Sequence, residues 1–290
     1  MVLIRKIHTQ IMWLMKLSRY PYFWWAVGGF YFLGVMSAGM HHEVNVLMTV
    51  LLMFWFIFPG AIFFNALNDA YDYESDRLNP RKQELEMASP TEGRSRLLWV
   101  SFWCLCTSIF LYPYVSSLFV ALFLLWVVGI VIYNVEPLRF KAVPVVNVIF
   151  GGVWHYVFLS LLGYVFVAGE LPPHQLTVIA TLFMTGMHII SGDAVDIEYD
   201  RAAGIKTLGV WIGSTRATLL LGAFVLFSMA VYGWVLGYTY GAILTLVFPL
   251  YVLYEIWRDD VANRKVVIYK NLSNFSIFYW FCIGSMYIVI

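Results

Sequence analysis

The sequence predicts an all-α membrane protein in which nine transmembrane helices form one bundle around a central, lipid-accessible cavity. Of its 290 residues, 61% are hydrophobic and 12% are charged, and the mean hydropathy is +0.77. Soluble domains carry roughly a quarter charged residues, so this chain has too few polar side chains to cover a globule. Lipid must therefore act as the solvent for part of its surface.

The predicted spans follow one another along a single domain, residues 1–290. A helix needs about 20 mostly apolar residues to cross a membrane. The segments that meet this requirement cover residues 22–40, 45–67, 97–114, 116–134, 145–168, 175–192, 216–236, 239–257 and 272–290. Only a few residues around Tyr112-Pro113-Tyr114 separate the third span from the fourth, and Gly237-Tyr238-Thr239 separates the seventh from the eighth. Both pairs are expected to form tight helical hairpins.

The distribution of charge predicts the topology. All 18 Lys and Arg residues lie in the N-terminal segment or in the loops after the second, fourth, sixth and eighth spans. Because basic loops favour the cytoplasm, we expect the N-terminus inside the cell membrane and the C-terminus outside. The net charge of +1 argues against a nucleic-acid partner. The three cysteines lie in apolar runs and lack the spacing of a disulfide framework or a zinc site.

Carboxylates and amides gather at the inner ends of the second and sixth spans. Residues three, four and seven apart share one face of a helix. The first stripe of this kind consists of Asn65, Asn68, Asp72 and Asp76, with Asp69 beside it, and the second consists of Asp193, Asp196 and Asp200. The three-then-four spacing of the first stripe recurs in the second, so the chain uses the same pattern twice.

These two stripes predict a site for a diphosphate chelated by Mg²⁺. Stacked carboxylates repel one another and are costly to desolvate, so a cation between the stripes would stabilise them. Hard oxygen ligands select Mg²⁺ or Mn²⁺, and Mg²⁺ commonly bridges a few carboxylates to a substrate phosphate. The expected metal ligands are Asn68, Asp72, Asp76, Asp196 and Asp200. The alternative is that the acidic residues are merely solvated helix ends, which suits one Asp better than two matched stripes.

Basic side chains near the stripes could neutralise the diphosphate oxygens that the metal leaves free. They are Arg77, Arg201 and Lys206 after the acidic clusters, and Arg139 and Lys141, with Tyr133 nearby, after the fourth span. Each basic residue could instead anchor the topology or contact a lipid headgroup. The motifs around Lys141 and Lys206 favour diphosphate binding at those two positions.

The clusters resemble the motifs of the UbiA superfamily of intramembrane prenyltransferases. The first family motif, N-D-x-x-D-x-x-x-D, matches Asn68, Asp69, Asp72 and Asp76. The second, D-x-x-x-D followed by R-x-x-G-x-x-T, matches Asp196, Asp200, Arg201, Gly204 and Thr207. The third, Y-x-x-x-P-x-R-x-K, matches Tyr133, Pro137, Arg139 and Lys141, and Ser18-Arg19-Tyr20-Pro21 is similar to an early S-R-P segment. The resemblance covers nearly the whole chain and implies nine spans and Mg²⁺-dependent prenyl transfer through an allylic cation.

Within this family, residues 72–82 and 187–201 look most like the lycopene elongase branch. That resemblance implies transfer from dimethylallyl diphosphate to a carotenoid such as lycopene, within isoprenoid and carotenoid biosynthesis. An aromatic quinone precursor or a lipid headgroup stays open as the acceptor, because acceptor pockets diverge on one scaffold. A non-enzymatic transporter or scaffold also stays open, although a transporter more often places its charges near the bilayer midplane.

Roles can be assigned to these residues as expectations. The catalytic candidates are Asp72, Asp196, Asp200, Lys141 and Tyr133. The substrate-binding candidates are Asn65, Asn68, Asp69, Arg77, Arg139, Lys141, Arg201, Lys206, Asp193 and His188. Asp193 could ligate metal, pair with a Lys or take a proton, while His188 could bond a neighbouring helix or touch the acceptor. The inner loops 77–96 and 193–215 are expected to cap the diphosphate site, since long loops are often lids.

Overall fold

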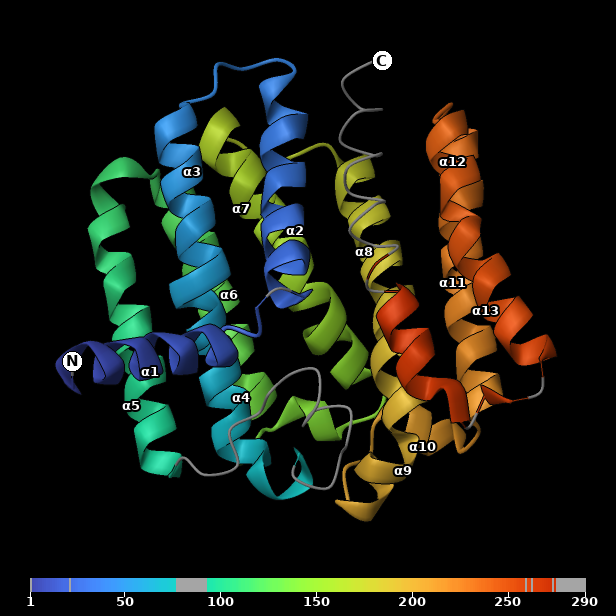
Figure 1. Cartoon of the computed structure of the whole chain (residues 1–290). Coiled ribbons are helices and arrows are strands. Elements are labelled where there is room, and N and C mark those ends of the chain that lie inside the picture. Colours follow the sequence, from blue (N-terminus) through green and yellow to red (C-terminus); the bar gives the residue numbers. More distant parts are fainter. Residues whose placement is uncertain are drawn as a thin grey trace. The chain divides into compact units, whose positions relative to one another are not determined.

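The structure is a computed structural model that describes residues 2–20, 22–76, 93–258, 260–261, 263–272 and 274. The side chains of residues 2–4, 22, 25 and 73–76 are also outside the description. Every regular element in the described ranges is a helix or a helical turn (Figure 1). The all-α prediction is therefore confirmed for this part of the chain.

Within the described residues, seven helical segments are long and apolar enough to cross a membrane. They cover Val46–Asp72, Arg94–Tyr114, Ser117–Asn134, Val148–Ala168, His174–Ala202, Thr215–Val235 and Thr239–Trp257. The shorter apolar helix Ala26–Gly39 lies at the first predicted span. The ninth predicted span, 272–290, falls almost entirely outside the described residues, so the count of nine stays a prediction. The helical segments that contain the second and sixth predicted spans continue beyond them, to Asp72 and Ala202.

The chain divides into two compact units, and helix α2 (Tyr22–Gly39) begins in the first and ends in the second. The first unit comprises Met1–Gly28 and Asn45–Val115, and the second comprises Gly29–Val44 and Ser116–Ile290. Each unit has its own cluster of buried hydrophobic side chains. The single domain over residues 1–290 and the central cavity stay predictions.

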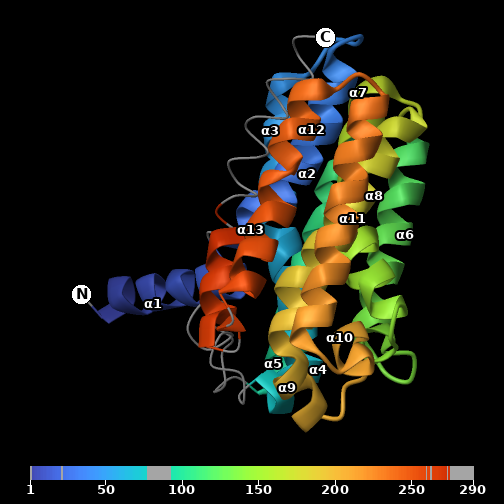
Figure 2. The same ribbon diagram turned by 90° about the vertical axis from the view of Figure 1, so that its right-hand side faces the viewer.

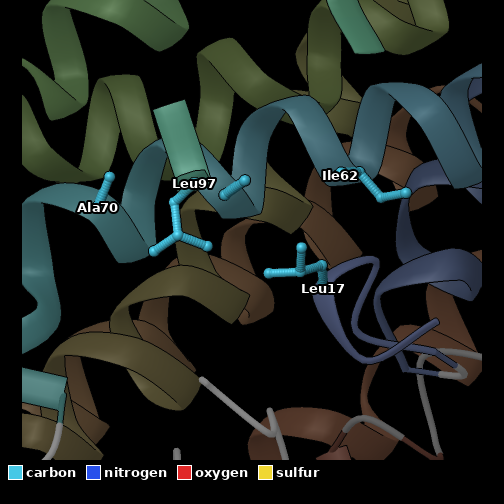
Figure 3. Close-up of a cluster of buried hydrophobic side chains, with 5 residues drawn as sticks. Leu17, Ile62, Ala70 and Leu97 are labelled. Atoms are coloured by element: carbon cyan, nitrogen blue, oxygen red, sulfur yellow. The ribbon is translucent and has the colours of Figure 1, made fainter. Parts of the chain in front are cut away.

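The first unit is built on α4, which packs lengthwise against α5 while α1 lies crosswise to both (Figure 1). Its elements are α1 (Val2–Leu17), α3 (Val46–Trp55), α4 (Ala61–Asp76) and α5 (Arg94–Cys106). The buried cluster contains Leu17, Ile62, Ala66, Ala70 and Leu97 (Figure 3). Ala66 and Ala70 are small, so neighbouring backbones can approach α4 closely. The Ser101 hydroxyl donates to the Phe63 carbonyl over 2.8 Å and fixes α5 against α4.

In the second unit, α8 runs alongside α11 (Figure 2). The elements are α6 (Ser117–Asn134), α7 (His155–Ala168), α8 (His174–His188), α9 (Ala194–Ala202), α10 (Leu208–Ile212), α11 (Thr215–Val235), α12 (Thr239–Thr245) and α13 (Val247–Trp257). Glycine permits the close approach, because a Cβ atom at Gly222 of α11 would lie 2.4 Å from Ile190 Cγ1. In the C-terminal part of this unit, Arg264 donates two hydrogen bonds of 2.6 and 2.8 Å to buried Glu255 of α13.

In the part of the chain that the structure describes, three π-helical turns interrupt the long helical segments. They are Phe56–Gly60 before α4, Val148–Trp154 before α7, and Ile189–Asp193 before α9. Pro59 gives the first turn a physical cause, since its nitrogen cannot donate a backbone hydrogen bond. A π turn pairs residues five apart and changes the face on which later side chains lie. Two of the three turns lead directly into the acidic motifs.

Candidate active site

The first acidic motif lies on α4, and its polar side chains are buried. Asn65 is fully buried, and Asn68, Asp69 and Asp72 are at most 8% exposed. Asp76 ends the helix, but its side chain lies outside the described residues. Neither amide atom of Asn65 has a hydrogen-bond partner among the described residues. Burying polar groups in this way costs free energy, and a bound ligand would offset that cost.

Arg19 pairs with Asp69 inside the first unit. The Arg19 Nη2 atom lies 2.7 Å from Asp69 Oδ1, and the two side chains are 12% and 7% exposed. Arg19 has a left-handed backbone conformation with φ of 54° in the turn after α1. Trp24 closes this turn, because its Nε1 donates to Ser18 Oγ over 2.9 Å. The sequence placed Arg19 in an S-R-P-like segment but did not predict its ion pair.

The second acidic motif runs from the π turn into α9. Asp193 and Asp196 are buried, and Asp200 is half-buried. Thr207 donates a hydrogen bond of 3.1 Å from Oγ1 to Asp200 Oδ2. Gly204 allows this contact, since its φ of 72° lets the chain turn back after α9. The R-x-x-G-x-x-T segment therefore closes onto a carboxylate of its own motif.

Asn147 is a site residue that the sequence analysis missed. Its side chain is 2% exposed, and its Nδ2 donates to Asp193 Oδ1 over 2.8 Å. Its Oδ1 accepts a longer bond of 3.4 Å from the backbone N–H of Leu208 at the start of α10. Asn147 thus ties the π turn before α9 to the helix after it. The sequence signal for this role is a single polar residue within the apolar run 142–150.

The third predicted motif forms a compact turn after α6. A cis peptide bond joins Glu136 to Pro137, and Arg139 has a left-handed backbone with φ of 36°. The Arg139 guanidinium lies 3.5 Å from the Glu136 carboxylate. Lys141 follows in a single helical turn, Phe140–Ala142, and is 8% exposed. Burial of an ammonium group requires compensation by polar or charged partners, which distinguishes Lys141 from a lysine that only contacts lipid headgroups.

Tyr133 and His188 approach one another beside Gly151. A Cβ atom at Gly151 would lie 2.6 Å from both the Tyr133 hydroxyl and His188 Cε1. The Tyr133 ring meets the His155 ring edge-on with centroids 5.1 Å apart. His155 Nδ1 contacts the Phe150 carbonyl, so this histidine is held by its own π turn. The structure therefore joins two predicted site residues, Tyr133 and His188, in one place.

Other predicted residues are not brought into these buried groups. Arg201 and Lys206 are exposed on and after α9. Arg77 and most of the predicted lid, residues 77–92, lie outside the described residues. The second predicted cap, 193–215, contains α9 and α10 and is therefore largely helical. Whether either segment covers a diphosphate stays a prediction.

Each acidic motif offers oxygen ligands that suit Mg²⁺. Asn68 and Asp72 are four residues apart on α4, and Asp196 and Asp200 have the same spacing on α9. The described residues contain no group of three or more His, Cys, Asp and Glu that could hold a metal ion alone. Mg²⁺ does not need such a cage, because it binds few carboxylates and completes its shell with water and substrate phosphate. The residues present fit such an ion.

Comparison with known proteins gives one consistent match. Residues 17–281 match the family model of the UbiA prenyltransferase family. The chain is 31% identical over 248 residues to a lycopene elongase/hydratase of Haloarcula japonica, covering 83% of this chain and 80% of that protein. It is 30% identical over 290 residues to the lycopene elongase/hydratase of Halobacterium salinarum, covering 96% and 98% of the two chains.

Solved structures share the fold. A UbiA homolog from Archaeoglobus fulgidus bound to DMAPP and Mg²⁺ aligns with a TM-score of 0.66 at 19% identity, covering 94% of this chain and 99% of that one. A structure from work on digeranylgeranylglyceryl phosphate synthase in membranes aligns with a TM-score of 0.65 at 18% identity. The alignment covers 97% of this chain and 100% of that one. At these identities the likeness shows the fold alone.

Proposed function

Because the chain belongs to the UbiA prenyltransferase family, we propose that it transfers a prenyl group from dimethylallyl diphosphate to a carotenoid-type polyene such as lycopene. Family membership makes it a prenyltransferase and an integral membrane protein. The match along 96% of the chain to a lycopene elongase/hydratase carries the acceptor assignment. Solved structures of this fold hold DMAPP or GPP together with Mg²⁺, so the fold accommodates allylic diphosphates.

Mg²⁺ would be held by Asn68, Asp72 and Asp76 of the first motif and by Asp196 and Asp200 of the second. When bound, it would stabilise the negative charge that builds on the departing diphosphate. The spacing, burial and oxygen chemistry of each motif support this assignment. Asp69 has a different role, because its carboxylate already pairs with Arg19. We assign Asp69 to positioning the motif.

Basic side chains would bind the diphosphate oxygens. Lys141 is the strongest candidate, since it is a buried ammonium group in a motif of the family. The other candidates are Arg77, Arg139, Arg201 and Lys206. Positioned cations of this kind stabilise the leaving group as the C–O bond breaks towards an allylic cation. Apolar helices exclude the water that would otherwise quench this cation.

The predicted orientation fits this chemistry. Both acidic motifs and their basic neighbours belong to the inner side, so the diphosphate would be taken from the cytoplasm. The acceptor would enter from the membrane, because a long polyene is soluble in lipid. Membrane lipid is therefore a partner, because it dissolves the acceptor.

The proposal is tested with purified protein in lipid nanodiscs. Mg²⁺ and prenyl diphosphates of several lengths would be combined with lycopene, an aromatic acid or an archaeal glyceryl lipid, and products would be identified by mass spectrometry. We expect Mg²⁺-dependent diphosphate release and a C5 extension of lycopene. Transfer to the lipid would instead favour an activity like that of the Thermococcus kodakarensis digeranylgeranylglyceryl phosphate synthase, to which the chain is 27% identical over 200 residues. Transfer only to the aromatic acid would exclude the carotenoid acceptor while keeping the prenyltransferase assignment.

A further inference from the structure

Helix α1 (Val2–Leu17) presents basic and apolar side chains on the outside of the first unit. We propose that α1 lies in the membrane–water interface and binds the phosphate groups of anionic phospholipids such as phosphatidylglycerol. The inference concerns the membrane that surrounds the protein, so it does not depend on the prenyl-transfer activity proposed above.

The sequence of α1 separates its basic side chains from its apolar ones. Residues three, four and seven apart share one face of a helix. The basic face carries Arg5, Thr9 and Lys16, with Lys6 beside it. The apolar face carries Ile7, Ile11 and Met15. A helix divided in this way lies along a membrane surface, with its apolar face among the acyl chains and its basic face among the headgroups.

Both faces are exposed in the structure. Ile7 and Ile11 are 51% and 52% exposed. Arg5, Lys6 and Lys16 are exposed as well. Leaving large apolar side chains in water forfeits the free energy of burying them. For a protein embedded in a membrane, the acyl chains of lipid are the apolar medium that can cover Ile7 and Ile11.

A third face of α1 fixes the direction of the helix. Leu17 is 2% exposed and belongs to the buried cluster that contains Ala66 and Leu97, and Trp13 and Leu14 pack against this cluster. The helix runs crosswise to α4 and α5, and its N-terminal turns extend away from both (Figures 1 and 2). Because α4 and α5 belong to segments that can span a membrane, a helix crosswise to them runs along the plane of that membrane.

The contacts of α1 with α5 place it at the depth of the membrane surface. Arg94 and Arg96 are exposed in the first turn of α5, where the spanning segment Arg94–Tyr114 begins. Arg96 Cζ lies over the Trp13 ring, 4.2 Å from its centroid, and Arg96 Nη2 donates to Gln10 Oε1 over 3.3 Å. Tryptophan is enriched where a membrane meets water. The helix is thus level with a charged turn and not with the apolar middle of the span.

The charge of this surface selects anionic headgroups. Helix α1 contains no Asp or Glu, and the first acidic residue of the chain is Glu43. Arg96 adds a further cation where α1 crosses α5. The attraction of basic residues to an anionic membrane grows with each cation near its surface, whereas a zwitterionic headgroup has no net charge to attract them. A second copy of the chain fits less well, because pairing α1 with α1 would bring like charges together.

The orientation of α1 is tested with spin labels on the full chain in nanodiscs of phosphatidylcholine and phosphatidylglycerol. One nitroxide is attached at Ile11→Cys and another, separately, at Thr9→Cys, after the three native cysteines are replaced by Ala. We expect the label on the apolar face to be accessible to oxygen, which concentrates in lipid. The label on the basic face should be accessible to a water-soluble nickel complex. Two water-accessible labels, or two lipid-buried labels, would overturn the proposal.

The contribution of charge is tested by the variant Arg5→Gln/Lys6→Gln/Lys16→Gln. Native mass spectrometry of the detergent-solubilised protein would measure its affinity for phosphatidylglycerol and for phosphatidylcholine. We expect the ratio of the two affinities to decrease about 100-fold, since each cation near the surface contributes a factor of about five. High salt should lower the wild-type ratio in the same direction, because it screens exposed charges.

The matched control removes the same charge from other elements, in the variant Arg216→Gln/Arg258→Gln/Lys270→Gln. This control should keep most of the preference for phosphatidylglycerol. Equal decreases in the two variants would overturn the proposal, because the attraction would then belong to the whole surface and not to α1. A wild-type protein without the preference would overturn it too, and spin–spin broadening between labels on two chains would show that a second copy covers α1 instead of lipid. None of these measurements requires catalysis, so the proposed function stands or fails separately.

Discussion

The two acidic motifs share their spacing, and each contains buried carboxylates, but they are held in different ways. On α4, Asp69 is bound by the guanidinium of Arg19, which lies fifty residues earlier in the chain. Around α9, Asp193 is bound by the Asn147 amide and Asp200 by the Thr207 hydroxyl. Asp69 of the first motif thus pairs with a cation, whereas Asp193 and Asp200 of the second accept hydrogen bonds from neutral side chains.

This difference distinguishes carboxylates that hold a helix in place from carboxylates that could bind a metal. A cation beside a carboxylate compensates its charge, so Asp69 contributes to the position of α4 more than to the binding of a metal. A neutral donor orients a carboxylate without supplying an opposite charge. Matching sequence spacing therefore does not assign matching roles.

The largest expected effect comes from the carboxylates that both motifs would give to the metal. Asp72→Ala and Asp200→Ala should each lower kcat by about 1,000-fold, because each removes a ligand that supports charge stabilisation on the leaving group. Diphosphate release in nanodiscs measures this. EDTA should abolish wild-type activity, and added Mg²⁺ should restore it in the wild type but not in either variant.

Asp69→Asn provides the matched comparison for this test. If Asp69 is an anchor, this variant should keep more activity than Asp72→Ala at saturating Mg²⁺. Equal losses in the two variants would contradict the division between anchoring and metal binding within the first motif.

A smaller effect is expected from the anchor itself. Arg19→Met removes the guanidinium that lies 2.7 Å from the buried Asp69 carboxylate, which should cost about 3 kcal/mol of stability. Thermal denaturation midpoints in detergent would show this loss as a marked decrease relative to the wild type. The double variant Arg19→Met/Asp69→Leu removes the uncompensated charge as well, so its midpoint should rise again.

The double variant makes the anchor test decisive. If Arg19 and Asp69 interact directly, the stability changes of the two single variants do not add. The double variant is then more stable than the sum of the single changes predicts. Additive losses would show that Arg19 and Asp69 do not stabilise one another. In that case the 2.7 Å contact would have no energetic role.

The sequence predicted most of the spans because apolar length decides them. Seven described segments match predicted spans, because a run of about 20 apolar residues is stable only within a membrane or a protein core. Helix α1 was not predicted, because its sixteen residues mix basic and apolar side chains and are too few to span. The helix that contains the sixth span continues to Ala202, beyond the apolar run that predicted the span. Asp193 and Asp196 are charged residues that are nevertheless buried.

The sequence also identified the motif residues but not their partners. Local spacing places Asn68 near Asp72 and Asp196 near Asp200 on their helices. The contacts of Asp69 and Asp193 join residues 50 and 46 positions apart, and tertiary packing decides such contacts. The π turns were not predicted either, although Pro59 in the first of them removes a backbone donor. They set the placement of His188 against Asp193, which regular helical spacing would not give.

The smallest expected effect concerns the neutral anchor of the second motif. Thr207→Val keeps the shape of the side chain but removes the hydroxyl that donates to Asp200 Oδ2 over 3.1 Å. A hydrogen bond to a charged group contributes about 1.5 kcal/mol, which corresponds to about a tenfold decrease in kcat/KM. Thr207→Ser retains the hydroxyl and should stay close to the wild type. If Thr207→Val and Thr207→Ser have the same kcat/KM, the hydroxyl does not orient Asp200. The backbone turn through Gly204 must then position this carboxylate.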